Sequence, residues 1–219
     1  MLSKILATIR EFFGVASKVQ DIQELDSNEI LYTTPTLNDS LPQETLPKAD
    51  ESTDCALIHE DDWRQFEYVE LIYHAQIEQE LQSIDEIWEK YSVPIDEYSG
   101  FKKVHIRKLI PHPIDIEFTL DDFEKLLGSE SLPFSFSDST GYVRGIRAVK
   151  LGESVVYAEI RAGRLRSLGF DIVGRPNFPP EIIKSLVEFA NANQLQLIHW
   201  RSRTRFESSS STYTYFSGE

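Results

Sequence analysis

The residues able to act as nucleophiles, metal ligands or phosphate binders are few, and their spacing fits none of these roles. Cys55 is the single cysteine, and it lies in a polar stretch where nothing rigid would orient a base beside it. The chain has no Gly-x-Ser-x-Gly nucleophile elbow, and no two of its five histidines have the i, i+4 spacing of a helical zinc site. Gly141 and Gly145 are not followed by the Lys-Ser or Lys-Thr of a phosphate-binding loop. The sequence therefore predicts no catalytic residue, no metal site and no cofactor.

Arginines toward the C-terminal end form the one cluster suited to binding anions. Arg201, Arg203 and Arg205 recur at every second residue, which on a strand places them on one face of a sheet. Arg161 and Arg164 flank the turn of a predicted hairpin. A guanidinium group binds phosphate or carboxylate through two parallel hydrogen bonds. These five arginines are candidates for an anion-binding site that takes an acidic partner or an RNA-like strand, or they neutralise the protein's own acidic segments.

A long helix with an acidic face is predicted over residues 63–91. Phe66, Val69 and Tyr73 begin an apolar stripe with three- and four-residue spacing, and Pro94 limits the helix at its end. The opposite face carries the candidate partner-binding carboxylates Glu67, Glu70, Glu78, Asp85 and Glu89. Such a face is either simply solvated or a docking surface for a basic protein, and complementary charge would mainly speed association.

Charge is sorted along the chain. The formal net charge is −14; residues 56–100 hold twelve acidic and two basic residues, whereas residues 131–219 hold eleven basic and eight acidic ones. A double-stranded DNA surface repels a protein of this charge, so duplex DNA is excluded as a general partner. A basic protein is the partner that the charge favours.

The first 18 residues predict an amphipathic helix. Its apolar face, a candidate for docking on a membrane or in a groove, consists of Leu2, Ile5, Leu6, Ile9, Phe12 and Phe13. Lys4 and Arg10 interrupt the apolar positions, so a secretory signal is disfavoured and a cytoplasmic location is expected. Three interpretations remain open: the helix packs on the protein's own core, in a partner's groove, or on the inner face of an anionic membrane.

The rest of the chain predicts an α+β domain. Residues 19–55 are acidic, proline-containing and without apolar period, which is typical of a flexible linker. Residues 56–207 form the predicted globular domain: an antiparallel sheet of about five strands, packed with the long helix and one or two further helices, among them 120–127 and about 181–193. Residues 208–219 are expected to be a weakly ordered tail, in which Tyr213, Tyr215 and Phe216 alternate as a short strand would.

The leading functional hypothesis from the sequence is a non-enzymatic interaction protein. It would be of the inhibitor, immunity or adaptor kind and would bind a basic partner through its acidic face. One alternative is a peripheral membrane protein anchored by residues 1–18. Another is a hydrolase or nucleotide-processing enzyme whose site is not visible in the sequence. The sequence gives neither the partner's identity nor the oligomeric state.

Overall fold

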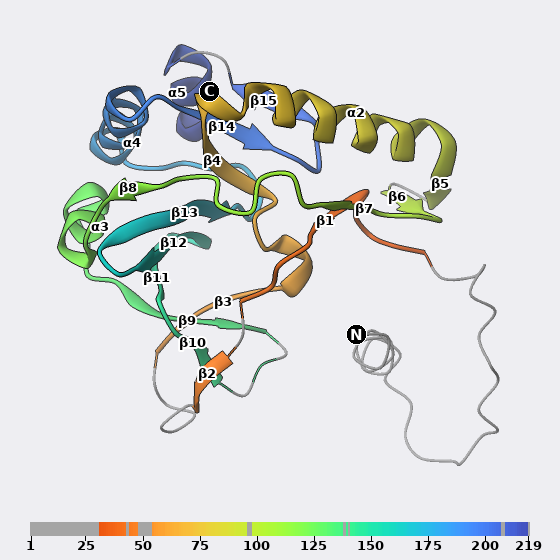
Figure 1. Cartoon of the computed structure of the whole chain (residues 1–219). Coiled ribbons are helices and arrows are strands. Elements are labelled where there is room, and N and C mark those ends of the chain that lie inside the picture. Colours follow the sequence, from red (N-terminus) through yellow and green to blue (C-terminus); the bar gives the residue numbers. More distant parts are fainter. Residues whose placement is uncertain are drawn as a thin grey trace. The chain divides into compact units, whose positions relative to one another are not determined.

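A mixed sheet of nine strands forms the centre of the computed structural model (Figure 1). The structure describes residues 31–42, 44–47, 54–95, 98–137, 139, 141–206 and 209–218, all of which belong to a unit spanning Leu31–Glu219. The predicted helix of residues 1–18, with the docking candidates Leu2, Ile5, Leu6, Ile9, Phe12 and Phe13, lies outside the described residues. The interpretations of that helix therefore stay predictions.

The main sheet is larger than predicted and is not purely antiparallel. Its strands run in the order β15 (Thr204–Phe206), β14 (Leu195–His199), β4 (Phe66–Glu70), β13 (Arg164–Asp171), β12 (Ser154–Arg161), β11 (Ile146–Leu151), β9 (Leu132–Phe136) and β3 (Ala56–Ile58), and β8 (Ile116–Glu117) also pairs with β13. Neighbouring strands are antiparallel except β3 and β9, which are parallel. The α+β class is confirmed, whereas the prediction of about five antiparallel strands is wrong, because several short strands are defined only by pairing with distant segments.

Strand β4 is the largest departure from the sequence prediction, since it lies inside the range expected to be helical. Glu67, Tyr68 and Val69 are all nearly inaccessible to solvent, at 0%, 1% and 0% exposure, because β4 is inserted between β13 and β14. The helix that follows, α2 (His74–Tyr91), begins after the short 3-10 helix η2 (Leu71–Tyr73). The apolar residues of β4 continued the spacing of the α2 stripe by coincidence, so periodicity alone extended the helix too far.

The boundaries of two helices follow local sequence signals. Helix α3 (Leu120–Leu127) begins at Thr119, whose hydroxyl accepts the Asp122 backbone N–H while Asp122 accepts the Thr119 backbone N–H. Gly128 closes α3 in the left-handed conformation with φ 60°. Helix α4 (Pro180–Ala192) starts with proline at its first position, where no intrahelical N–H is required. The predicted helices 120–127 and 181–193 are thus confirmed.

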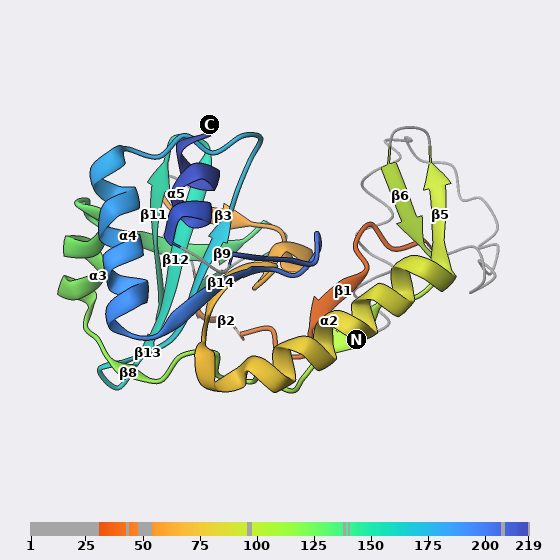
Figure 2. The same ribbon diagram turned by 90° about the horizontal axis from the view of Figure 1, so that it is seen from above.

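The sheet buries both of its faces. Helices α3 and α4, together with α5 (Ser209–Ser217), cover one face, where Phe123, Ile183 and Phe216 pack with Val156 and Leu168 of the sheet. Helix α2 covers β4 and β14 from the opposite face through Ile77 and Ile84, which pack with Val69 and Ile198. Figures 1 and 2 show α4 and α5 side by side and α2 running away from β4 toward the hairpin of β5 (Ser92–Ile95) and β6 (Tyr98–Phe101).

Segments expected to be loosely organised contain regular structure. β1 (Thr36–Asn38) pairs with β7 (His105–Arg107), and β2 (Glu44–Pro47) pairs with β10 (Gly141–Val143), although both β1 and β2 fall in the predicted linker. Residues 209–217, in the range expected to be a weakly ordered tail, form the helix α5, although Tyr213, Tyr215 and Phe216 alternate as a short strand would. The decisive contact for α5 is distant in sequence: the Phe216 ring is buried and stacks on Phe178 at 5.0 Å between centroids.

Candidate functional site

The predicted partner-binding carboxylates do not form one exposed face. Glu67 and Glu70 lie in β4, and Glu67 is completely buried, so placing these two on an exposed helical face was wrong. The Glu70 carboxylate accepts the Asp115 backbone N–H at 2.6 Å. Glu78, Asp85 and Glu89 lie on α2, where Glu89 is exposed. Binding of a basic partner by this set stays a prediction.

The predicted anion-binding arginines meet acidic groups of the same chain. Arg201 pairs with Asp62 at 2.7 Å, Arg203 with Asp85 at 2.8 Å and Arg205 with Glu78 at 2.5 Å. The three do not alternate along one strand, because residues between β14 and β15 form a turn in which the Arg203 N–H bonds to Trp200 O. The opposite charges sorted along the sequence therefore meet across the fold.

The other two predicted arginines also have carboxylate partners. Arg161 pairs with Glu159 at 2.6 Å, and the Arg164 guanidinium bonds to Asp115. These pairs are partly exposed at one or both ends, so each contributes little to stability. Arg161 and Arg164 lie on β12 and β13, which β4 separates from β14 in the sheet, so anion binding by the five arginines together stays a prediction.

A buried ionic network joins β4 to the segment around β7. Arg64 donates to both Glu67 carboxylate oxygens at 2.6 and 3.2 Å, and the Trp200 indole N–H donates to Glu67 at 2.9 Å. The Arg107 guanidinium lies over the Trp200 ring at 5.0 Å and donates to Arg64 O at 2.6 Å. Burial lowers the pKa of Arg107 to about 9, and the charge of Glu67 works in the opposite direction. With Arg64, Glu67 and Arg107 at most 4% exposed, this network is a structural element closed to ligands.

A second buried carboxylate holds a loop in place. Glu80 of α2 accepts the backbone N–H groups of Lys108 and Leu109 at 2.9 and 2.8 Å, and it bonds to the His105 ring. Burial acts to raise the pKa of Glu80, but these hydrogen bonds, led by that of His105, hold it below its ordinary value. All of the groups that bond to Glu80 belong to the fold, so its role is to position residues 105–109.

The arrangement that resembles a ligand site is a cavity of about 410 Å³ at the open edge of β14, here called the edge cavity. Its polar lining consists of Tyr68, His74, Asn191, Gln196, Arg205, Ser209 and Thr212. Its apolar lining consists of Leu71, Val187, Ala190, Leu195, Leu197 and Phe206. The volume lies within the range of sites for small organic molecules, and the lining offers both apolar surface and hydrogen-bonding groups.

Strand register explains why a cavity forms there. β15 pairs with β14 only at residues 197–199, so among the described strands Leu195 and Gln196 are paired by β4 alone. The Leu71 N–H bonds to Gln194 O at 2.9 Å and fixes the start of α2 beside this edge. The Asn191 and Ser209 side chains bond to each other at 3.0 and 3.1 Å and fix the end of α4 to the start of α5.

Two buried polar atoms of the lining have no hydrogen-bond partner among the described residues. They are the Tyr68 hydroxyl and the Gln196 side-chain nitrogen, in residues that are only 1% and 7% exposed. Burial raises the pKa of Tyr68 well above its ordinary value, so the phenol is neutral and can donate a proton in a hydrogen bond. An unsatisfied buried polar group costs about 1–3 kcal/mol, so a native structure that keeps two in one cavity requires an explanation.

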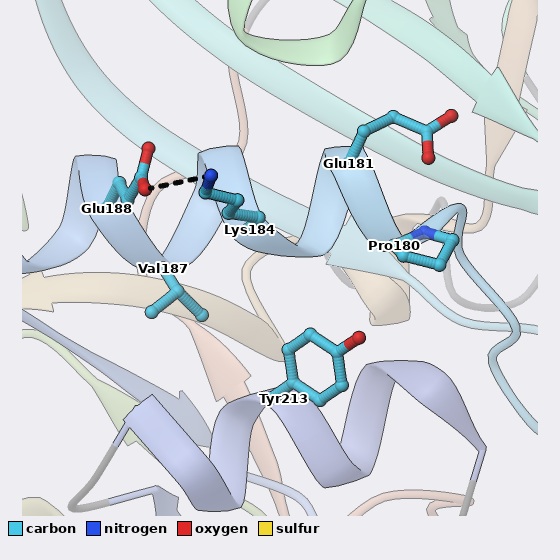
Figure 3. Close-up of a pocket in the computed structure, with 6 residues that line it drawn as sticks. All are labelled: Pro180, Glu181, Lys184, Val187, Glu188 and Tyr213. Carbon is cyan, nitrogen blue, oxygen red and sulfur yellow. Dashed lines mark ion pairs between the residues drawn. The ribbon is translucent and has the colours of Figure 1, made fainter.

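A second hollow of about 400 Å³ lies between α4 and α5 and shares Val187 with the edge cavity. Figure 3 shows Val187 and the Tyr213 ring pointing into the gap between the two helices, while Glu181 points away from it. Lys184 and Glu188 form an exposed ion pair at 3.8 Å. None of the six lining residues carries one of the unpartnered buried polar atoms, so this hollow offers no comparable recognition group.

Other chemistry is weakly represented in the part of the chain that the structure describes. There, no three His, Cys, Asp or Glu side chains gather closely enough to hold a metal ion. Cys55 directly precedes β3 and is partly buried. The Ser202 hydroxyl lies 2.7 Å from His199 Nδ1, but the Ser202 backbone N–H donates to the same nitrogen at 3.1 Å, so the imidazole closes the β14–β15 turn.

Sequence reasoning missed the edge cavity. Tyr68 was assigned to a helix, and Gln196 was a polar residue in an otherwise apolar strand; only the second carried a usable signal. Of the predicted site residues, Arg205 alone lines the cavity.

No protein-family model, curated protein or solved structure matches this chain. Within the described residues, no helix is both long and apolar enough to cross a membrane.

Proposed function

We propose that the protein binds a small organic molecule in the edge cavity. The observation that carries this proposal is the pair of unpartnered buried groups, the Tyr68 hydroxyl and the Gln196 side-chain nitrogen, in the lining of one cavity. A bound molecule with acceptor atoms would satisfy both groups, and the apolar walls would bury its hydrocarbon part. Ordered water is the competing explanation, because a polar cavity of this size also holds water.

The test fills the cavity with protein atoms. Ala190 of α4 is 7% exposed and lines the cavity, whereas Ala192, on the same helix, is exposed and does not. We expect Ala190→Phe to abolish binding and Ala192→Phe to leave it unchanged. Circular dichroism and urea denaturation would establish that both variants are folded.

The probes are three acids with different apolar bodies, benzoate, 2-naphthoate and octanoate, each with its neutral amide. Binding would be measured by ligand-observed NMR on the full chain. The proposal requires saturable binding of at least one probe at a single site, and loss of that binding in Ala190→Phe only. If no probe binds the unsubstituted protein, or if both phenylalanine variants bind equally, the proposal is wrong.

Recognition of a basic partner protein remains a separate proposal from the sequence. Of the carboxylates predicted for such a partner, Glu78 and Asp85 already pair with Arg205 and Arg203, whereas Glu89 is exposed; the acidic stretch of residues 21–53 would add negative charge. A salt-sensitive complex with an identified basic protein, weakened by Glu89→Gln, would support it.

A further inference from the structure

We infer that the edge cavity recognises an organic anion, with its acid group beside Arg205 and its hydrocarbon body against the apolar wall. This inference rests on the proposed function and adds the chemical class of the ligand. It follows from three observations: the strand register sorts the lining residues by face, the unpartnered groups are donors, and Arg205 is the one arginine among the residues that line the cavity.

The two kinds of wall belong to opposite faces of the same strand edge. Ile198 is the register partner of Arg205, so Gln196, two residues earlier on β14, shares the face of Arg205 and lies diagonally from it. Leu197 is the register partner of both Tyr68 and Phe206, which places these three on the other face, toward α4 and α5. A ligand at this edge thus meets the charged residue from one face of the sheet and hydrocarbon from the other.

Both unpartnered groups are donors that lack a hydrogen-bond acceptor. The Gln196 side-chain nitrogen can only donate, and the Tyr68 hydroxyl is a neutral donor. The complementary ligand group is therefore rich in acceptor oxygen. Gln196 shares the face of Arg205, whereas Tyr68 lies on the face of the apolar wall, so Gln196 is the donor placed with Arg205. A carboxylate offers two acceptor oxygens and no donor, which suits a guanidinium and an amide N–H better than an alcohol or an amine does.

Arg205 supplies the charge that distinguishes an acid from a neutral carbonyl compound. Its guanidinium bonds to Glu78 Oε1 at 2.5 Å and lies 3.2 Å from His74 Nδ1, at the start of α2. The Arg205 side chain is 24% exposed, whereas that of Glu78 is 53% exposed. Glu78 can therefore turn into water at little cost when a ligand carboxylate takes its place on Arg205, and the arginine keeps a negative partner throughout.

Arg203 provides a matched control for this role. It pairs with Asp85 of the same helix at 2.8 Å and is 36% exposed, but it does not line the edge cavity. Arg203→Gln and Arg205→Gln therefore remove the same charge and the same kind of ion pair from neighbouring positions. Only the second change removes a cation from the cavity.

The experiment compares each acid with its own amide in the unsubstituted protein, in Arg205→Gln and in Arg203→Gln. We expect the acid to bind at least about tenfold more tightly than the amide, a difference of about 1.4 kcal/mol. Arg205→Gln should remove this preference, with acid and amide then binding equally weakly, and Arg203→Gln should keep it. Arg205→Lys retains the charge and should retain part of the preference, which covers the case in which Arg205→Gln does not fold.

The outcomes separate the two proposals. Binding of amide and acid with equal affinity, both lost in Ala190→Phe, would overturn the anion inference and leave the small-molecule function standing. A preference for the acid that survives in Arg205→Gln would also overturn it. Absence of binding by every acid and every amide would overturn the proposed function and, with it, this inference.

Discussion

Two buried tyrosines in neighbouring parts of the sheet give the sharpest test of the reasoning, because they differ in one hydrogen bond. The Tyr157 hydroxyl accepts the backbone N–H of Arg64 at 2.7 Å, whereas the Tyr68 hydroxyl has no partner among the described residues. Both side chains are at most 1% exposed. The change from tyrosine to phenylalanine removes one oxygen in each case and leaves the ring in place.

The expected effects on stability have opposite signs. Tyr157→Phe leaves the Arg64 N–H buried and unsatisfied, which should lower the free energy of unfolding by about 1–3 kcal/mol. Tyr68→Phe removes a group that is itself unsatisfied, so the ligand-free protein should become more stable by about 1 kcal/mol. Most single mutations destabilise a protein, which makes the sign at Tyr68 informative.

Urea denaturation of the full chain, followed by tryptophan fluorescence and circular dichroism, would measure both changes. The slope against urea should be the same in all three proteins, so that the midpoint reports stability. If Tyr68→Phe destabilises the ligand-free protein as much as Tyr157→Phe does, its hydroxyl is satisfied and the case for the edge cavity fails.

Three further predictions concern stability. Glu67→Gln should lower the free energy of unfolding by about 3–5 kcal/mol, because it leaves a buried arginine charge without its carboxylate. Asp85→Asn breaks an exposed pair and should lower it by under about 1 kcal/mol. Equal losses for the two variants in urea denaturation would contradict this. Burial, with the nearby charge of Asp62, raises the pKa of Asp171 to about 6. Between about pH 4 and 6 the folded protein keeps this proton, whereas the unfolded chain, with its carboxyl near 3.8, has released it, so the free energy of unfolding falls as the pH rises through this range. Asp171→Asn should flatten that decline, which is on the order of 1 kcal/mol after allowing for partial exposure. An unchanged dependence of the urea midpoint on pH would refute this. Thr119→Ala should lower the free energy of unfolding by about 1 kcal/mol, since the α3 cap is lost, and Thr119→Ser should restore most of it.

The structure shows that part of the acidic excess is paired with arginines of the same chain. The acidic excess of residues 56–100 suggested a surface for a basic partner. In the structure, Arg201, Arg203 and Arg205 from the basic end of the chain reach Asp62 and α2. Distance along the sequence hid this pairing, because the two segments meet through the antiparallel β4–β14 pair and through the packing of α2 on β14.

Local rules predicted the elements whose stability is decided locally. The capping box of Thr119 and Asp122, Gly128 after α3 and Pro180 at the start of α4 each act within one helical turn, so the sequence alone placed these helix ends. The alternating strands β12 and β13, joined by a tight turn, were also predictable from neighbouring residues. These helix boundaries and this hairpin depend on the backbone geometry of neighbouring residues, and distant contacts do not override it.

Tertiary contacts decided the rest. Phe66–Glu70 is a strand because β13 and β14 supply its hydrogen-bonding partners on both sides, and residues 209–217 are a helix whose Phe216 enters a core built from distant segments. The edge cavity depends on where β15 stops along β14 and on how α2, α4 and α5 meet there. By itself, the sequence determined the α+β class, the locally capped helices and the amounts of charge and apolar surface. Which charges cancel, and which polar groups are left unpartnered in a cavity, depends on long-range pairing, and no short window of sequence contains both members of such a pair.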